Sequence, residues 1–208
     1  IPCEISFVKL ASYQGTTSTG TIKEVIGIKD GYNTFATMHI LNTKKGVYYV
    51  ADTLINRHPD AEVLTDIAKL SKQTVEFFNE EPVIAMLSYS NFGSDEVGSP
   101  TRVHQAVEQM QNEFPNLAID GEMQVNFALD KTLRDDKFPF SRLKGKEVNT
   151  LVFPNMSSAN CSYKLLQALN PDCEIIGPIQ MGLNRAIHFT DFDHRPLASK
   201  IPHGILDN

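Results

Sequence analysis

Residues 82–89 read PVIAMLSY, and residues 83–87 of this segment are apolar without interruption. Side chains alternate between the two faces of a sheet along a strand, so a strand of this kind presents apolar groups to both faces. Such strands are typical of parallel sheets that are covered by helices on both sides. We therefore predict a central strand here, with helices packed on each of its faces.

Strand-like and helix-like segments alternate on either side of this strand. Apolar residues three and four apart predict a helix that Asp60 caps and that ends near Phe78. The β-rich runs at 35–41 and 47–51, joined by five residues that include a glycine, predict an antiparallel hairpin. Further strands are predicted at residues 5–10, 117–120, 148–153 and 174–177, and further helices at 101–114, 123–136 and 157–169.

This alternation predicts an α/β fold with three layers, in which a mostly parallel sheet also carries the antiparallel hairpin. We expect one domain over residues 1–190. Residues 191–208 contain two prolines and a glycine and show little periodicity, so we expect a divergent tail. The chain opens with Ile-Pro-Cys rather than Met, and we expect it to be part of a longer protein.

Composition excludes several classes of function. The chain has 19 Lys and Arg against 25 Asp and Glu, and its formal net charge of −6 does not favour nucleic acid. No apolar run approaches the roughly 20 residues of a membrane span. The three cysteines, Cys3, Cys161 and Cys173, form no C-x-x-C pair, which argues against a disulfide framework and a zinc site and favours a cytoplasmic location.

Ligands of open α/β sheets bind beyond the carboxyl ends of the strands, and four segments of this chain fall at such ends. They are rich in glycine, hydroxyl and amide residues, which suit phosphate oxygens and close approach of a ligand to the backbone. A structural interpretation stays open, in which Ser157 and Ser158 cap a helix and the glycines only form turns. The segments are SYSNFGS (88–94), DGEMQ (120–124), FPNMSSAN (153–160) and GPIQMG (177–182).

Alternation along the central strand also predicts which side chains of the segment at 88–94 face a ligand. Ser88 and Ser90 are expected to face the ligand, and Gly93 to keep a Cβ out of its path. Tyr89 is then expected to point away and to pack on the covering helices. A basic patch at Arg142, Lys144 and Lys146 is either a solvated loop or a contact for ligand phosphates, and the DFDH run at 191–194 is not expected to bind a metal.

The four segments, in this order and spacing, closely resemble the motifs of the phosphate acetyl/butyryl transferase family over residues 34–188. Asn91-Phe92-Gly93 looks most like the phosphotransacetylase-like domain of large hybrid NADP-dependent malic enzymes. The resemblance implies an isocitrate/isopropylmalate dehydrogenase-like sheet and a fragment of a two-subdomain unit with a coenzyme A cleft. It implies ligand-binding roles for Ser88, Ser90, Asn91, Gly93, Asp120, Glu122, Gln124, Pro154, Ser158, Asn160, Tyr163, Lys164, Gly177 and Pro178.

The chain departs from active transferases at the family's catalytic positions. Alignment through the Gly-Pro strand places Asp191 on the family's serine, Phe192 on its arginine and Ala198 on its aspartate. Lys23 falls near a second family arginine and lacks the planar fork that grips phosphate with two hydrogen bonds. No catalytic residue is therefore assigned, and the loss of these groups is expected to leave little transfer activity.

Two functions stay open. The first is an acetyl-CoA-binding regulatory domain of a malic enzyme that oxidatively decarboxylates malate to pyruvate, and the second is an active phosphate acetyltransferase that moves an acyl group between coenzyme A and phosphate. The expected partners are acetyl-CoA or a related acyl-CoA, upstream malic-enzyme domains and further copies in a homo-oligomer. NADP and a divalent metal are expected only upstream, since this segment has no G-x-G-x-x-G fingerprint and no credible carboxylate set.

Overall fold

The apolar run forms β3 (Val83–Leu87), and all five of its residues are buried. This computed structural model describes residues 22–185, so the expected strand at 5–10 and the tail with Asp191, Phe192 and Ala198 lie outside the described residues. Ile84 and Met86 belong to one apolar core, and the alternate residues of β3 belong to a second core on the opposite face. The prediction of a strand covered on both faces is confirmed.

The strands form one mixed sheet in the order β4-β3-β5-β2-β1-β6. Neighbouring strands among β4, β3, β5 and β2 are parallel, whereas β1 is antiparallel to both β2 and β6. The predicted hairpin is β1–β2, with a shorter connection than expected. The bounds are β1 (Ala36–Thr43), β2 (Gly46–Ala51), β4 (Ala118–Met123), β5 (Thr150–Val152) and β6 (Glu174–Met181).

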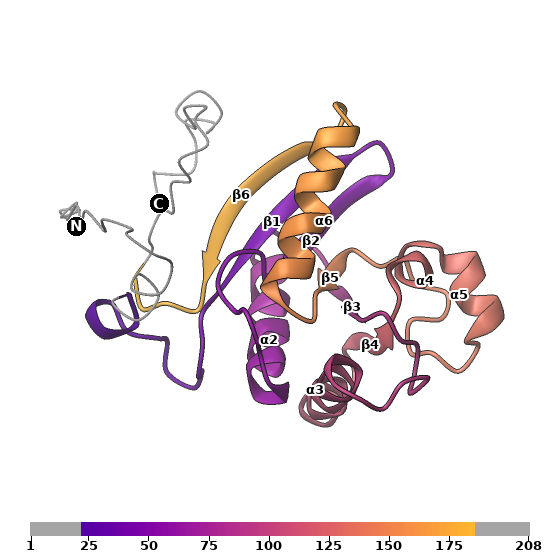
Figure 1. The fold of residues 1–208 in the computed structure, drawn as a ribbon, viewed down its shortest axis with the longest axis horizontal. Helices are drawn as coiled ribbons and strands as arrows, with labels where there is room; N and C mark the ends of the chain where they lie inside the picture. The colour runs from indigo at the N-terminus through magenta and orange to yellow at the C-terminus, as the bar shows by residue number, and fades with distance from the viewer. Residues whose placement is uncertain (1–21, 186–208) are drawn as a thin grey trace.

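Helices cover both faces of this sheet (Figure 1). α2 (Ala61–Phe77) and α3 (Ser99–Glu113) supply the first core, while α6 (Met156–Leu169) supplies the second. Asp60 caps α2 as predicted, since its carboxylate accepts a hydrogen bond from the Val63 amide at 2.8 Å. Between residues 22 and 185, no helix has the length and apolar character that a bilayer crossing requires.

Three predicted boundaries are wrong for local physical reasons. The helix expected at 123–136 is two helices, α4 (Val125–Leu129) and α5 (Lys131–Lys137). Asp130 divides them because its carboxylate accepts from the Leu133 amide at 2.9 Å and starts a new helix. The strands expected to end at residues 120 and 177 continue through their glycines to Met123 and Met181.

A glycine substitution tests the packing of β4 on β3. A Cβ at Gly121 would overlap the carbonyl oxygen of Met86, whereas a Cβ at Gly46 would meet nothing within 4 Å. The two glycines have similar positive φ, +148° and +137°, so Gly46→Ala is a matched control for backbone strain. We expect Gly46→Ala to cost about 1 kcal/mol and Gly121→Ala more than about 3 kcal/mol in urea unfolding. Equal losses would contradict this packing.

Candidate functional site

Two β-bulges lie within the sequence motifs that were predicted to bind ligand. The pairing of β3 with β4 shifts in register between Met86 and Leu87, opposite residues 121–123. The pairing of β1 with β6 shifts opposite residues 177 and 178, where Gly177 and Pro178 lie. Bulges redirect side chains and are frequent next to functional sites. Gly121 and Gly177 therefore lie within strands, at the bulges, and do not form turns after the strands.

Glu122 holds the loop that follows β3. Its side chain is fully buried, and its Oε1 atom accepts hydrogen bonds from the Gly93 amide at 2.6 Å and the Ser90 hydroxyl at 3.0 Å. Asn91 Oδ1 accepts from the Gln124 amide at 2.8 Å. The structure thus brings five of the predicted residues into one group, which we call the Glu122 cluster: Ser90, Asn91, Gly93, Glu122 and Gln124.

The serine hydroxyls of this loop do not both face a ligand. Ser90 Oγ lies 2.8 Å from Ser94 Oγ and accepts from the Asp95 amide at 3.0 Å, in addition to its bond to Glu122. Its capacity for hydrogen bonds is filled by the loop. Ser88 Oγ is buried and has no hydrogen-bond partner among the described residues. Space is open beside Gly93, because a Cβ there would meet nothing within 4 Å.

The expectation for Tyr89 is wrong. Its side chain is 60% exposed, and its hydroxyl donates to the Asp95 carboxylate at 2.9 Å. β3 ends at Leu87, so the alternation that predicted packing against the helices no longer applies at residue 89. Gln124 Nε2 donates to the Tyr89 carbonyl at 2.7 Å, which holds this backbone to the end of β4.

Asp120 anchors a different loop. One of its carboxylate oxygens accepts from the Ser141 hydroxyl and the Arg142 amide, each at 2.7 Å. Beyond this anchor, the Arg142 guanidinium contacts the Pro115 carbonyl at 3.5 Å, and the Lys146 ammonium lies 3.6 Å from the Glu81 carboxylate. Residues 81 and 115 precede β3 and β4, so the side chains of Arg142 and Lys146 lie near the amino ends of these strands, while the Arg142 backbone contacts the segment at 120–124.

A second group surrounds His39 in β1. The side chain is buried, with 5% of the residue exposed, and its ring stacks on Tyr163 with 4.3 Å between ring centroids. A Cβ at Gly177 would lie only 2.9 Å from His39 Cδ2, so the glycine lets the strand pass close to the imidazole. Burial and then the charge of Lys164 lower the pKa of His39 to about 4, so the ring is neutral near pH 7.

Asp52 fixes the loop that follows β2. It is 1% exposed, and its Oδ1 accepts from the Thr37 amide and hydroxyl, each at 3.0 Å. Its Oδ2 accepts from the Asn56 amide at 2.6 Å. Thr53 lies next to Asp52 and its carbonyl accepts from the Asn160 amide group at 3.3 Å. We call Thr37, His39, Asp52, Thr53, Asn160, Tyr163 and Gly177 the His39 cluster.

Sequence analysis missed four members of this cluster: Thr37, His39, Asp52 and Thr53. A signal existed, because Asp52 and Thr53 follow β2 just as Ser88 follows β3, and these strands run in the same direction as their common neighbour β5. The sequence pattern marks this hairpin only as an antiparallel addition to the parallel sheet, and so it does not mark the end of its second strand as a ligand-binding edge.

The remaining predicted residues lie around α6 and β6. Pro154 is buried after β5, the Ser158 hydroxyl donates to the Asn155 carbonyl at 2.9 Å, and Lys164 is exposed. Pro178 lies in the β6 bulge. Asn155 caps α6 by accepting from the Ser158 amide, so Ser157 and Ser158 are not the caps. Across residues 22–185, no three His, Cys, Asp or Glu side chains are grouped to hold a metal ion.

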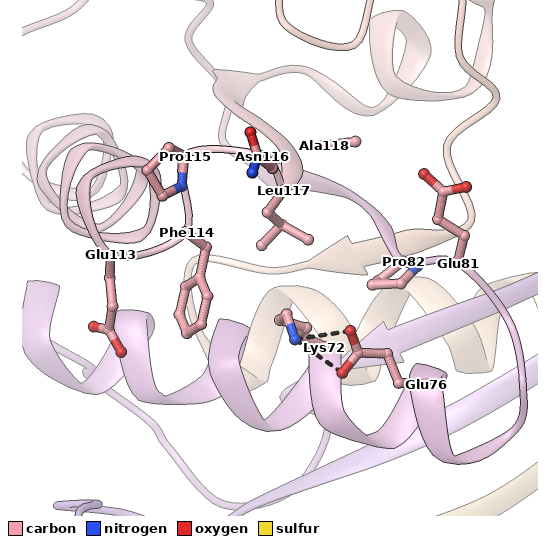
Figure 2. A pocket seen from close by; sticks show the side chains of 10 residues that line it. All are labelled: Lys72, Glu76, Glu81, Pro82, Glu113, Phe114, Pro115, Asn116, Leu117 and Ala118. Carbon is pink, nitrogen blue, oxygen red and sulfur yellow. Dashed lines mark hydrogen bonds and ion pairs between the residues drawn. The ribbon is translucent and has the colours of Figure 1, made fainter.

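A hollow of about 430 Å³ lies elsewhere, at the amino ends of β3 and β4 (Figure 2). Lys72, in its wall, donates to both carboxylate oxygens of Glu76 at 2.7 and 2.9 Å, and its ammonium is 5.3 Å from the Phe114 ring centroid. None of the predicted site residues lines this hollow. Each charged side chain of the wall has an ion-pair partner, since Glu113 pairs with Lys69 and Glu81 with Lys146, so we place the candidate site at the opposite edge.

A comparison against protein families identifies the family of this chain. The family model described as "Phosphate acetyl/butaryl transferase" matches residues 11–192. The chain belongs to the phosphate acetyl/butyryl transferase family.

Named relatives fall into two groups. The chain is 41% identical over 167 residues to the NADP-dependent malic enzyme of Escherichia coli (strain K12), covering 80% of this chain and 22% of that protein. It is 34% identical over 165 residues to the phosphate acetyltransferase of Bacillus subtilis (strain 168), covering 79% of this chain and 50% of that enzyme. A phosphotransacetylase structure from Streptococcus pyogenes superposes with a TM-score of 0.73 at 34% identity, covering 79% of this chain and 50% of that one.

The chain therefore spans half the length or less of these relatives. The α/β architecture is that of the phosphotransacetylases. The isocitrate/isopropylmalate dehydrogenase-like assignment and the domain limits at residues 1–190 stay predictions.

The pKa of His39 predicts a pH dependence of stability. Between about pH 6.5 and pH 4 the unfolded chain binds a proton on this residue and the folded protein does not, so stability falls as the pH is lowered through that range. The loss attributable to His39 is about 3 kcal/mol. His39→Phe should show a correspondingly smaller loss in urea unfolding at pH 4.5 relative to pH 7. Parallel pH profiles for the two proteins would contradict the assignment.

Proposed function

We propose that this chain is an acetyl-CoA-binding regulatory domain of a malic enzyme, and that it is degenerate as a phosphotransacetylase. The observation that carries the proposal is the 41% identity to a malic enzyme over 167 residues, a span long enough to include both clusters. The parent protein then converts malate to pyruvate in its other part, which holds NADP and the divalent metal. Ligand binding here reaches that active site as a coupling free energy.

The surface beside Gly93 suits the uncharged arm of an acyl-CoA. Gly93 has an open outer face, and the ring of its neighbour Phe92 lies 4.8 Å from the Phe138 ring and 5.0 Å from the Phe140 ring, measured between centroids. Phe140 is 67% exposed. Apolar surface next to an accessible backbone is the combination that a pantetheine arm and a thioester require.

The residues at the family's catalytic positions support binding without transfer. A transferase needs cations that stabilise the phosphate during attack on the thioester. Alignment of the motifs places Asp191, Phe192 and Ala198 where active relatives have serine, arginine and aspartate, so that cation is replaced.

The second candidate is an active phosphate acetyltransferase. The observation that favours it is 34% identity to the Bacillus subtilis enzyme over half of that enzyme's length. Both candidates bind acetyl-CoA, and for both we expect a cytoplasmic location and a homo-oligomer. Only the presence or absence of acyl-transfer activity therefore distinguishes them.

We expect the full chain, and the longer protein that contains it, to bind acetyl-CoA in calorimetric titration. We also expect both to form negligible acetyl phosphate from acetyl-CoA and phosphate, because the family's serine, arginine and aspartate are replaced. The measurement is release of free thiol from acetyl-CoA with and without phosphate. Turnover of about 1–10³ s⁻¹, the ordinary range for enzymes, would establish the second candidate instead.

A pair of glycine variants locates the ligand. Gly93 and Gly98 lie in the same loop, with φ of +84° and +79°, and a Cβ at either position meets nothing within 4 Å. Valine at either should cost about 1–2 kcal/mol through backbone strain alone. Only Gly93→Val should weaken acetyl-CoA binding, by at least about tenfold. Equal affinities of the two folded variants would remove this loop from the site.

A further inference from the structure

His39 lies at the end of a chain of hydrogen bonds that begins at a buried carboxylate. Asp52 Oδ1 accepts from the Thr37 hydroxyl at 3.0 Å. Thr37 Oγ1 lies 2.9 Å from Thr53 Oγ1, and Thr53 Oγ1 lies 2.9 Å from His39 Nδ1. All four residues are buried, with 5% or less of each exposed. The chain links β1 to the loop that follows β2.

Each hydroxyl in this chain has one proton, which fixes the direction of every bond. Thr37 gives its proton to the Asp52 carboxylate, so it must accept from Thr53. Thr53 gives its proton to Thr37, whose hydroxyl lies at 2.9 Å and whose carbonyl lies at 3.5 Å, so it must accept from His39. His39 therefore carries its proton on Nδ1, and Nε2 is a bare nitrogen that can only accept a hydrogen bond.

The imidazole is packed on two sides. The ring stacks on Tyr163, and a Cβ at Gly177 would lie 2.9 Å from Cδ2. Nδ1 is occupied by Thr53, and no described residue forms a hydrogen bond with Nε2. Nε2 is not among the buried side-chain atoms that lack a partner, so it is accessible to a donor from outside the described fold.

We propose that His39 Nε2 accepts a hydrogen bond from an amide N–H of the pantetheine arm of the bound acyl-CoA. This inference rests on the proposed function. It names His39 as a ligand-binding residue and gives Asp52, Thr37 and Thr53 the role of positioning its tautomer.

The chemistry of a bare nitrogen excludes the phosphates and the thioester of an acyl-CoA as partners. Phosphate oxygens and the thioester carbonyl are acceptors, and Nε2 has no proton to give them. A metal ion needs further ligands, and the described residues supply no group of three. The donors are the amide N–H groups and the hydroxyl of the pantetheine arm, and the amine and hydroxyl of the adenosine. Adenosine 3′,5′-bisphosphate keeps the adenosine donors and lacks the arm, so a comparison of the two ligands distinguishes these partners.

The tautomer is tested first, in the full chain, by nitrogen-15 NMR of the imidazole. We expect a protonated Nδ1 and an unprotonated Nε2 in the wild-type protein. Thr53→Val removes the acceptor and should convert His39 to the other tautomer. Thr53→Ser keeps the hydroxyl and should preserve the wild-type tautomer. A wild-type protein with its proton on Nε2 overturns the proposal without any ligand.

Affinity is tested next, by calorimetry with acetyl-CoA and with adenosine 3′,5′-bisphosphate, which lacks the pantetheine amides. His39→Phe keeps the stacked ring and should weaken acetyl-CoA binding about tenfold, while its affinity for the bisphosphate matches the wild type. Thr53→Val should show the same selective loss, and Thr53→Ser should not.

The outcomes separate this proposal from the one on which it rests. Wild-type protein that fails to bind acetyl-CoA overturns both. Wild-type binding with unchanged affinity in His39→Phe, or with equal losses for both ligands, overturns only the role of His39. If His39→Phe does not fold, the comparison of Thr53→Val with Thr53→Ser decides, because both keep the imidazole.

Discussion

Buried carboxylates fix the loops around the strands of this sheet. Asp52, Asp120 and Glu122 are each exposed by 8% or less. A buried carboxylate is costly unless donors surround it, and here backbone amides of neighbouring loops are among those donors. Asp52 holds the segment after β2, Glu122 holds the segment after β3, and Asp120 holds the segment at 141–142. Loop shape therefore depends on acidic side chains anchored in or beside the strands.

Much of the architecture follows from local sequence. Uninterrupted burial at residues 83–87, helical periodicity after Asp60 and the hairpin all rest on interactions within a few residues, and all are confirmed. The bulges were not predictable in this way, because glycine normally marks a turn and here Gly121 and Gly177 lie inside strands. The His39 cluster depends on pairing between strands and on α6, so no single window of sequence contains it.

Sequence predicts the place of the candidate site in the fold better than the role of each side chain in it. Two of the four segments, 88–94 and 153–160, follow strands as expected. The segments 120–124 and 177–182 instead lie largely within β4 and β6, and the Glu122 cluster joins the first of these to residues 90–93. However, the side chains chosen for ligand contact include several that the structure uses internally, such as the Ser90 hydroxyl and the Asp120 carboxylate. A motif shared by a family contains residues that contact the ligand and residues that hold the loop. Only the hydrogen-bond partners in the fold distinguish the two kinds. By this criterion Gly93 and His39 are the points open to a ligand.

We propose that an acyl-CoA binds at the carboxyl edge of the sheet, away from the hollow between α2 and α3. Hydrogen–deuterium exchange of the full chain with and without acetyl-CoA distinguishes the two places. We expect slower exchange at residues 88–94 and 153–160 and in β1 around His39. Slower exchange confined to residues 72–82 and 113–118, which line the hollow, would contradict the account.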